Sequence, residues 1–321
     1  MNQIINETKN FIQEQTNYKQ NPLLMSYEKI GKVYAFTNEN IYGYMQQLDF
    51  NNKENSLSVM ASGDHPFNLS LYGIKTIDTF DINALTEYYA LGIKRSAILA
   101  FDYINYIAFM NKLLDKKLSL NELNDLINQI TPYMEKKYII FWKSLIDFYH
   151  IIQKESNTQI NLLHLLLLDA NKLGGYMVNS YLKSESNYNK LRNTISKTNI
   201  NFKQCDFNNI ASTFKNKYDF IILSNILDYL YKNLGSGWNY NQLLEIEKSL
   251  TQLLKQDGII ALNYIYNYFN ALECEYKKNI INFSNITHND LTKEKIITFQ
   301  NVFVNKIIHN SEAALLLVKH K

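Results

Sequence analysis

A single glycine follows a short apolar run, within the motif Ser62-Gly63-Asp64. Glycine adopts positive φ without strain and lets the backbone approach a bound molecule closely. Amide groups after such a turn can face a carboxylate or a phosphate. The full GxGxxG pattern of pyrophosphate-binding loops is missing, so the motif favours a smaller polar ligand group. A tight turn without a ligand is the alternative for these three residues.

A carboxylate, Asp81, ends the next β-branched run, Lys75–Phe80. At the end of the second strand of a βαβ unit, a carboxylate can accept hydrogen bonds from both hydroxyls of an adenosine ribose. Asp81 could instead cap a helix that begins near Asn83. Together, the glycine turn and Asp81 favour an adenosyl ligand over a cap alone.

A third carboxylate, Asp206, follows the run Ile200–Gln204. In this topology it would lie beside the adenine, where it could accept a hydrogen bond from the exocyclic amine. A plain turn residue is an equal alternative. Asp206 is therefore a candidate for base recognition only.

The segment after Tyr218–Leu223 contains the candidates for the reacting centre. Ligands of open α/β sheets bind beyond the carboxyl ends of the strands, so Ser224 is predicted to contact the ligand. Asn225 and Asp228 are predicted to hold a hydroxyl or amine, and Asp228 to take its proton. A helix cap at Ser224 or Asn225 is the alternative. Among the histidines, only His65 beside the glycine turn is a candidate for acid–base chemistry.

These residues need a parallel sheet to bring them together. Five short runs are predicted to be its strands: Ser56–Ala61, Lys75–Phe80, Ile200–Gln204, Tyr218–Leu223 and Ile259–Tyr264. Five segments are predicted to be helical: Asn38–Leu48, Asn68–Gly73, Ala84–Met110, Asn189–Ser196 and Leu243–Lys255. Strands that alternate with helices predict an α/β fold with a doubly wound sheet.

The carboxyl-terminal runs Lys295–Val304 and Ala313–His320 are too close for a helical crossover, so they predict an antiparallel hairpin. A mainly parallel sheet that ends in such a hairpin differs from the all-parallel dinucleotide dehydrogenases. It is typical of the Rossmann-like class I methyltransferase fold, whose ligand is S-adenosylmethionine. The hairpin and the lone glycine both argue against an NAD-binding oxidoreductase.

Domain boundaries follow from where strand patterns stop and resume. Residues 1–50 are predicted to be a helical lead-in, and residues 51–102 with 189–321 the S-adenosylmethionine-binding domain. Residues 103–188 are predicted to be a helical insertion that acts as a lid over the acceptor. Its expected helices are Leu118–Ile130, starting near Ser119 or Asn121, Met134–Ile152 and Ile160–Ala170.

The composition of the chain indicates which kinds of partner and location to expect. The net charge is +3 and no basic block occurs, so a dedicated nucleic-acid binder is disfavoured. Cys205 and Cys274 lack metal-ligand spacing, so we expect reduced thiols and no metal site. The amino terminus lacks a signal-peptide pattern, and the longest aliphatic run, Ala313–Val318, is too short to span a membrane. We expect a cytoplasmic protein.

Several stretches, from about Tyr27 to the carboxyl end, resemble the BtaA-like family of aminocarboxypropyl transferases. They are Ala61–Asp64, Asp81–Asn83, Tyr88–Ile98, Phe141-Trp142, Tyr181–Glu185 with Tyr188, and Leu223–Ile226. The resemblance implies S-adenosylmethionine binding. It also implies transfer of the 3-amino-3-carboxypropyl group, which the characterised branch moves onto a diacylglycerol hydroxyl.

Three functions remain open at this point. The first is a transferase that moves a methyl or 3-amino-3-carboxypropyl group onto a small-molecule or lipid-like acceptor. Displacement beside a sulfonium needs mainly alignment and exclusion of water, so no nucleophilic triad is expected. The second is an NAD-binding oxidoreductase, and the third a non-catalytic module that binds S-adenosylmethionine.

Overall fold

The computed structural model describes residues 33–156, 162–168, 176, 178–226, 240–266, 297–304 and 312–319. The chain divides into two compact units. We call Asn38–Met60, Asp64–Ile82 and Leu173–Lys321 the sheet unit. We call Met1–Thr37, Ala61–Gly63 and Asn83–Lys172 the helical unit.

The sheet unit contains one seven-stranded sheet in the order β5-β3-β2-β6-β7-β9-β8. Its strands are β2 (Asn55–Val59), β3 (Thr76–Asp81), β5 (Asn199–Gln204), β6 (Tyr218–Ile222), β7 (Leu254–Tyr266), β8 (Ile297–Val304) and β9 (Glu312–Lys319). The five central runs expected to be strands are all present. Strands β2, β3 and β6 are mostly buried because both faces of the sheet are covered, whereas the edge strand β5 is mostly exposed.

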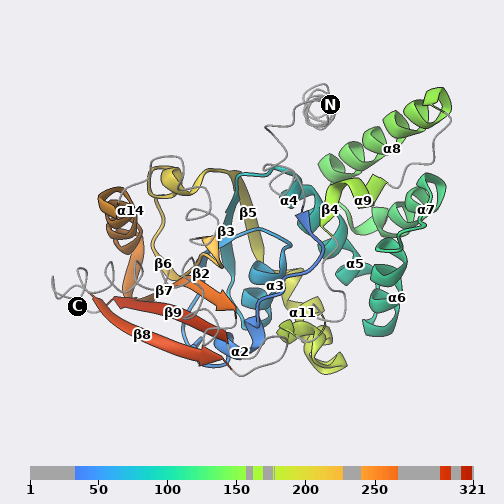
Figure 1. Ribbon diagram of the computed structural model, residues 1–321. Coiled ribbons are helices and arrows are strands. Elements are labelled where there is room, and N and C mark those ends of the chain that lie inside the picture. The colour runs from blue at the N-terminus through green and yellow to red at the C-terminus, as the bar shows by residue number, and fades with distance from the viewer. Residues whose placement is uncertain are drawn as a thin grey trace. The chain divides into compact units, whose positions relative to one another are not determined.

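Strand direction confirms the predicted fold class. Strands β5, β3, β2, β6 and β7 are parallel to one another. Strand β9 is antiparallel to both β7 and β8, and Figure 1 shows the resulting hairpin in red along β7. A strand order that reverses at β2, with one antiparallel strand inserted near the end, is that of the Rossmann-like class I methyltransferase fold.

Each face of the sheet has its own apolar core because alternate residues of a strand point to opposite faces. Ile221 packs in a cluster with Ile210 of α12 (Ile210–Thr213) and Leu250 of α14 (Tyr240–Gln252). Its neighbours Phe220 and Ile222 pack in the other cluster, which includes residues of α2 (Ile41–Met45) and α3 (Asp64–Leu71). Helix α11 (Glu185–Ile195) contacts α3. The result is a helix–sheet–helix sandwich.

A buried carboxylate on β3 connects this strand to β5, to β6 and to the segment just before β6. Asp78 accepts hydrogen bonds from Asn201 Nδ2 at 3.0 Å, from Asn216 Nδ2 at 2.9 Å and from the Tyr218 hydroxyl at 2.7 Å. Burial, and then the bond to Asp78, raise the pKa of Tyr218 far above its usual range. Three donors satisfy the carboxylate, so Asp78 is a structural residue.

A second buried carboxylate, Asp219, stabilises the start of β2. Its Oδ2 accepts from the backbone amides of Glu54 and Asn55, each at 2.9 Å, and from Lys255 Nζ at 2.8 Å. Burial alone would raise the pKa of Asp219, but Lys255 and the two amides outweigh it and hold the pKa below its usual value. Asp219 therefore connects β2, β6 and β7.

The helical unit consists mainly of the expected helices. They are α4 (Leu85–Glu87), the π-helix η2 (Tyr88–Lys94), α5 (Arg95–Ala100), α6 (Tyr103–Leu113), α7 (Leu120–Ile130), α8 (Lys136–Ser156) and α9 (Leu162–Leu166). Ser119 caps α7 as predicted, in a capping box with Glu122. The bonds of Glu122 to Lys112 and to Ser119 lower the pKa of its carboxyl to about 2.

One expectation for this unit is wrong. No strand was expected between residues 103 and 188, yet β4 (Leu167–Leu168) follows directly after α9 and pairs in parallel with β1 (Val33–Tyr34). Two residues carry too weak a pattern to separate a strand from the end of a helix. Within the helical pattern expected over Asn38–Leu48, the structure has the helix α2 over Ile41–Met45, in the sheet unit.

A glycine permits close packing inside the helical unit. A Cβ on Gly92 would lie 3.1 Å from Trp142 Nε1 and 3.1 Å from Tyr138 Cβ. The same Trp142 nitrogen donates to the carbonyl of Tyr88, whose ring stacks on Phe141 with 3.8 Å between centroids. The π-helix and α8 therefore meet through Gly92.

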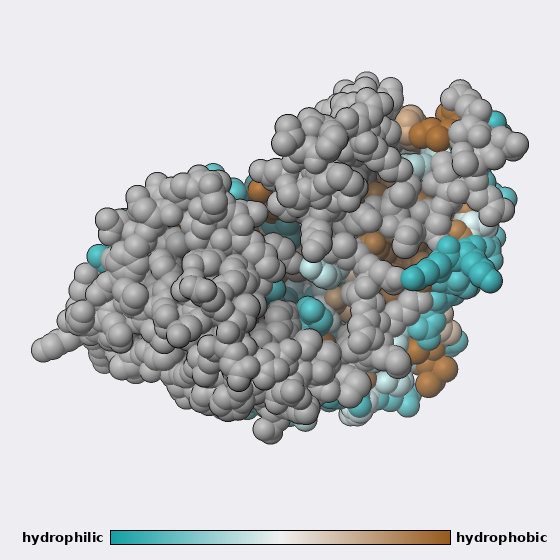
Figure 2. All heavy atoms as spheres, viewed as in Figure 1, coloured by the Kyte–Doolittle hydropathy of each residue, from teal (hydrophilic) through white to brown (hydrophobic). Residues whose placement is uncertain are grey.

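Among the described residues, no helix is both long and apolar enough to cross a membrane. The coloured part of the surface in Figure 2 mixes hydrophilic and hydrophobic residues. Among the described residues, four large apolar side chains are exposed: Ile82, Ile104, Tyr133 and Ile151.

Candidate functional site

The carboxyl ends of four neighbouring strands meet at one edge of the sheet. Val59 of β2 pairs with Phe80 of β3, and Asp81 pairs with Gln204 of β5. On the other side, Ser58 pairs with Ile222 of β6. Parallel strands end at a common edge, so the segments after β2, β3, β5 and β6 all begin there. This edge carries most of the predicted site residues.

The loop after β2 has the backbone that a glycine motif predicts. Gly63 has φ of 83° and Ala61 has φ of 42°, both in the left-handed region. Ser62 is buried, and its carbonyl accepts a hydrogen bond from Lys94 Nζ at 2.9 Å. The Lys94 ammonium lies 4.4 Å from the centroid of the Phe36 ring, a cation–π contact. These contacts all lie within the helical unit and hold the loop in place.

Asp64 has a different setting from the one expected. The predicted turn included Asp64, with a helix from Asn68, but α3 already begins at Asp64. Pro66 fits this first turn because an amide there has no partner within the helix. The Asp64 side chain is fully buried and accepts from the Tyr181 hydroxyl at 2.6 Å. Its carboxylate thus packs against protein, and contact with a ligand stays a prediction.

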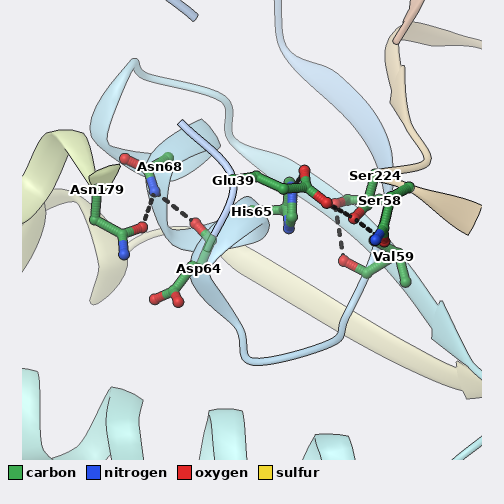
Figure 3. A network of polar contacts seen from close by, with 9 residues as sticks. Glu39, Ser58, Val59, Asp64, His65, Asn68, Asn179 and Ser224 are labelled. Carbon is green, nitrogen blue, oxygen red and sulfur yellow. Dashed lines mark hydrogen bonds and ion pairs between the residues drawn. The ribbon is translucent and has the colours of Figure 1, made fainter. Parts of the chain in front are cut away.

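A chain of hydrogen-bonded amides anchors the start of α3 within the sheet unit, as Figure 3 shows. Asn68 Nδ2 donates to the carbonyl of Asp64 at 2.7 Å and to Asn179 Oδ1 at 2.8 Å. The backbone amide of Ser180 donates to Asn68 Oδ1 at 2.8 Å. The buried side chain of Asn68 therefore links the start of α3 to the turn η4 (Ser180–Leu182).

A buried carboxylate, Glu39, connects two segments of the edge. Its Oε2 lies 3.0 Å from Nε2 of His65, the second residue of α3, and its Oε1 accepts a hydrogen bond from Oγ of Ser224 after β6 (Figure 3). Only 2% of Glu39 and 1% of His65 are exposed. The burial of Tyr44, and then the nearby charge of Glu39, raise the pKa of Tyr44 well above its usual value.

His65 has one ring nitrogen without a partner. Its Nδ1 is buried and makes no hydrogen bond in the described structure. A buried polar atom left in this way costs roughly 1–3 kcal/mol of stability. Such an atom next to a set of strand ends is a reason to look for a ligand there.

Asp81 is the last residue of β3, and its side chain is partly exposed at the edge. The next residue, Ile82, leaves 53% of its surface exposed, and Gln204 Nε2 donates to its carbonyl at 2.9 Å. A carboxylate followed by an exposed apolar side chain offers one group for ribose hydroxyls and another for the face of a base.

Two further predicted residues have structural partners. Asp206 caps the turn η5 (Phe207–Asn209), with Oδ1 accepting from the amide of Asn208 at 2.9 Å, so the turn alternative accounts for that oxygen. Ser224 has φ of 58° and, besides its bond to Glu39, has its Oγ 3.3 Å from Asn225 Oδ1. Asp228 lies outside the described residues, and its predicted role stays a prediction.

Glu39 was not among the predicted site residues. It lies in a segment expected only as a helical lead-in, and no motif surrounds it. Tyr181 was named only as part of the family resemblance, without a role at Asp64. Contacts across 26 and 117 residues leave no local pattern. The described residues also contain no group of three or more His, Cys, Asp or Glu placed to hold a metal ion.

Comparison with known proteins adds distant likenesses in fold. No protein-family model matches the chain, and no curated protein sequence matches it. The N-methyltransferase NodS of Bradyrhizobium japonicum WM9 is a similar solved structure at 9% identity and TM-score 0.40, covering 87% of this chain and 93% of NodS.

Two more solved structures are similar at the same level. Magnesium protoporphyrin IX methyltransferase (ChlM) of Synechocystis PCC 6803, with bound S-adenosylhomocysteine, has 8% identity, TM-score 0.36 and coverage of 87% and 79%. The plantazolicin methyltransferase BpumL, also with S-adenosylhomocysteine, has 9% identity, TM-score 0.37 and coverage of 95% and 88%. The strand order by itself defines the class: this chain has a Rossmann-like class I methyltransferase fold.

Proposed function

We propose that this protein is an S-adenosylmethionine-dependent transferase. The observation that carries the proposal is the partly exposed carboxylate of Asp81 at the end of β3, beside the end of β2, in a sheet with this strand order. In α/β sheets of this kind, the ligand lies beyond the carboxyl ends at the point where the strand order reverses, which here is β2.

The residues at the edge fit an adenosyl ligand. Asp81 would accept hydrogen bonds from the ribose hydroxyls, and the exposed side chain of Ile82 would contact the adenine. Gly63 and Asp64, which follow β2, are proposed to lie near the methionine moiety, and Ser62 to contact the cofactor as well. Asp206 would approach the adenine amine with the oxygen that does not cap η5.

Once bound, the sulfonium supplies an electrophilic carbon and a neutral thioether as leaving group. The protein then has to position an acceptor and exclude water. Ser224, Asn225 and Asp228 follow β6, the strand next to β2, and are proposed to border the reacting centre. The helical insertion is proposed to cover the acceptor.

We propose a small-molecule or lipid-like acceptor, a cytoplasmic location and no dedicated nucleic-acid site. The transferred group is methyl or, as the resemblance to the BtaA-like family implies, 3-amino-3-carboxypropyl. The two reactions leave different nucleosides: methyl transfer leaves S-adenosylhomocysteine and the other leaves methylthioadenosine.

The test is to incubate the purified protein with S-adenosylmethionine and a protein-free cell extract, and to identify the nucleoside product by mass. We expect one of the two products to accumulate only when both protein and extract are present. Binding of S-adenosylmethionine without either product would support the non-catalytic module instead. If the protein neither binds S-adenosylmethionine nor forms either product, the proposal fails.

A further inference from the structure

His65 lies at a position suited to accept a proton from the acceptor molecule. It is the second residue of α3, just after the loop that follows β2, and its partner network reaches Ser224 after the adjacent strand β6. All three residues of this network, Glu39, His65 and Ser224, belong to the sheet unit. The network therefore spans the two strand ends between which we place the reacting centre.

The direction of the hydrogen bonds determines what His65 can do. A carboxylate oxygen is an acceptor, so a hydrogen bond from Nε2 of His65 to Glu39 leaves Nδ1 with a lone pair. A carboxylate behind an imidazole also stabilises the imidazolium that forms when the ring takes up a proton. Nδ1 is the atom left over, buried and without a partner in the described structure.

The same contacts exclude a hydrolase-type triad. In such a triad the serine donates to the histidine, which the serine nucleophile needs as its base. Here the single hydroxyl proton of Ser224 points to Glu39 instead, with Asn225 Oδ1 a longer 3.3 Å from Oγ. Ser224 therefore helps to orient Glu39.

We propose that Nδ1 of His65, in place of Asp228, is the proton acceptor of the transfer reaction, with Glu39 and Ser224 as positioning residues. This inference rests on the proposed function. It assigns the acceptor class: a nucleophile that must lose a proton, namely a hydroxyl or an N–H group. A nucleophile that is already deprotonated would not need His65.

The proposed step balances. The acceptor oxygen or nitrogen forms a bond to the carbon beside the sulfonium, and the carbon–sulfur bond breaks with its electron pair going to sulfur. The acceptor proton moves to Nδ1. The positive charge lost at sulfur reappears on the imidazolium, next to Glu39.

The first test is nitrogen NMR of the full-length protein with ¹⁵N-labelled histidine. S-adenosylhomocysteine and sinefungin are the probes, because sinefungin places a primary amine at the reacting centre and S-adenosylhomocysteine does not. We expect His65 to be in the Nε2–H form, and the Nδ1 resonance to shift with sinefungin much more than with S-adenosylhomocysteine. An Nδ1–H form, or an Nδ1 resonance that sinefungin leaves in place, would overturn the proposal.

The second test is calorimetry of His65→Gln, whose amide nitrogen can still donate to Glu39 while nothing replaces Nδ1. We expect its affinity for S-adenosylhomocysteine to stay within about threefold and its affinity for sinefungin to fall about tenfold or more, as for a lost hydrogen bond to a charged group. His150→Gln, the same change on α8 in the helical unit, is the control and should alter neither.

The outcomes separate the two proposals. If the wild-type protein binds neither probe, the proposed function fails. If it binds both, and His65→Gln binds them with unchanged affinities, the role of His65 fails while the proposed function stands. Should His65→Gln not fold, the wild-type spectra still decide.

Discussion

Nε2 of His65 lies 3.0 Å from Oε2 of Glu39, and both side chains are buried although the residues are 26 positions apart. This contact attaches the segment before α2 to the start of α3. Because Glu39 also accepts from Ser224, the same carboxylate reaches the end of β6. Burying a carboxylate lowers the stability of the fold unless hydrogen-bond partners compensate for the lost contact with water.

Tyr181→Phe tests the anchor of α3. The hydroxyl of Tyr181 donates to the fully buried carboxylate of Asp64 at 2.6 Å, so its loss removes a charge-assisted hydrogen bond. We expect the free energy of unfolding to fall by about 1–3 kcal/mol in chemical denaturation. Tyr72→Phe is the matched control, because its hydroxyl makes a longer 3.3 Å bond to Ser180. Equal effects of the two changes would contradict this account.

Asp219→Asn tests the anchor of β2 through its pH dependence. The folded-state pKa of Asp219 lies below its usual value of about 3.9, so the ionised form stabilises the fold above about pH 4, and that contribution is lost as pH falls through the lower, folded-state pKa. We expect a loss of about 1–3 kcal/mol at pH 7. The difference from wild type should shrink below pH 4 in denaturation curves. A difference that does not vary with pH would disprove the assignment.

Gly92→Ala tests the contact between the π-helix and α8. The added methyl group would lie 3.1 Å from both Trp142 Nε1 and Tyr138 Cβ, closer than most carbon contacts. We expect about 1–3 kcal/mol of destabilisation from overpacking, measured by thermal and chemical denaturation. Lys143→Ala, on an exposed position of α8, is the control and should change stability little. A variant as stable as wild type would show that the contact between η2 and α8 accommodates the methyl group with no loss of stability.

The sequence predicted the sheet well because its signals are local. Runs such as Tyr218–Leu223 are apolar without interruption, as strands covered on both faces must be, and the short link before Ala313 excluded a helical crossover. The position of Asp81 at the end of β3 followed from the same reasoning and is confirmed. Its contact with a ribose remains a prediction.

The details of the site could not be predicted because they depend on distant contacts or on weak local patterns. The start of α3 lies before the predicted one, because the helix includes Pro66. Proline usually indicates a break in a helix, but it is tolerated in the first turn. Strands β1 and β4 have two residues each and exist only as a pair. Glu39 has a role only because the fold brings it to His65.

The central claim, that Asp81 holds an adenosyl ligand at the sheet edge, is tested most directly by calorimetry with S-adenosylhomocysteine. Asp81→Asn keeps the size of the side chain and removes the charge, so we expect binding to weaken about tenfold or more. Asp49→Asn, at an exposed carboxylate of the same unit that accepts only from the amide of Asn51 among the contacts described, should bind like wild type. Equal affinity of Asp81→Asn and wild type would contradict the claim.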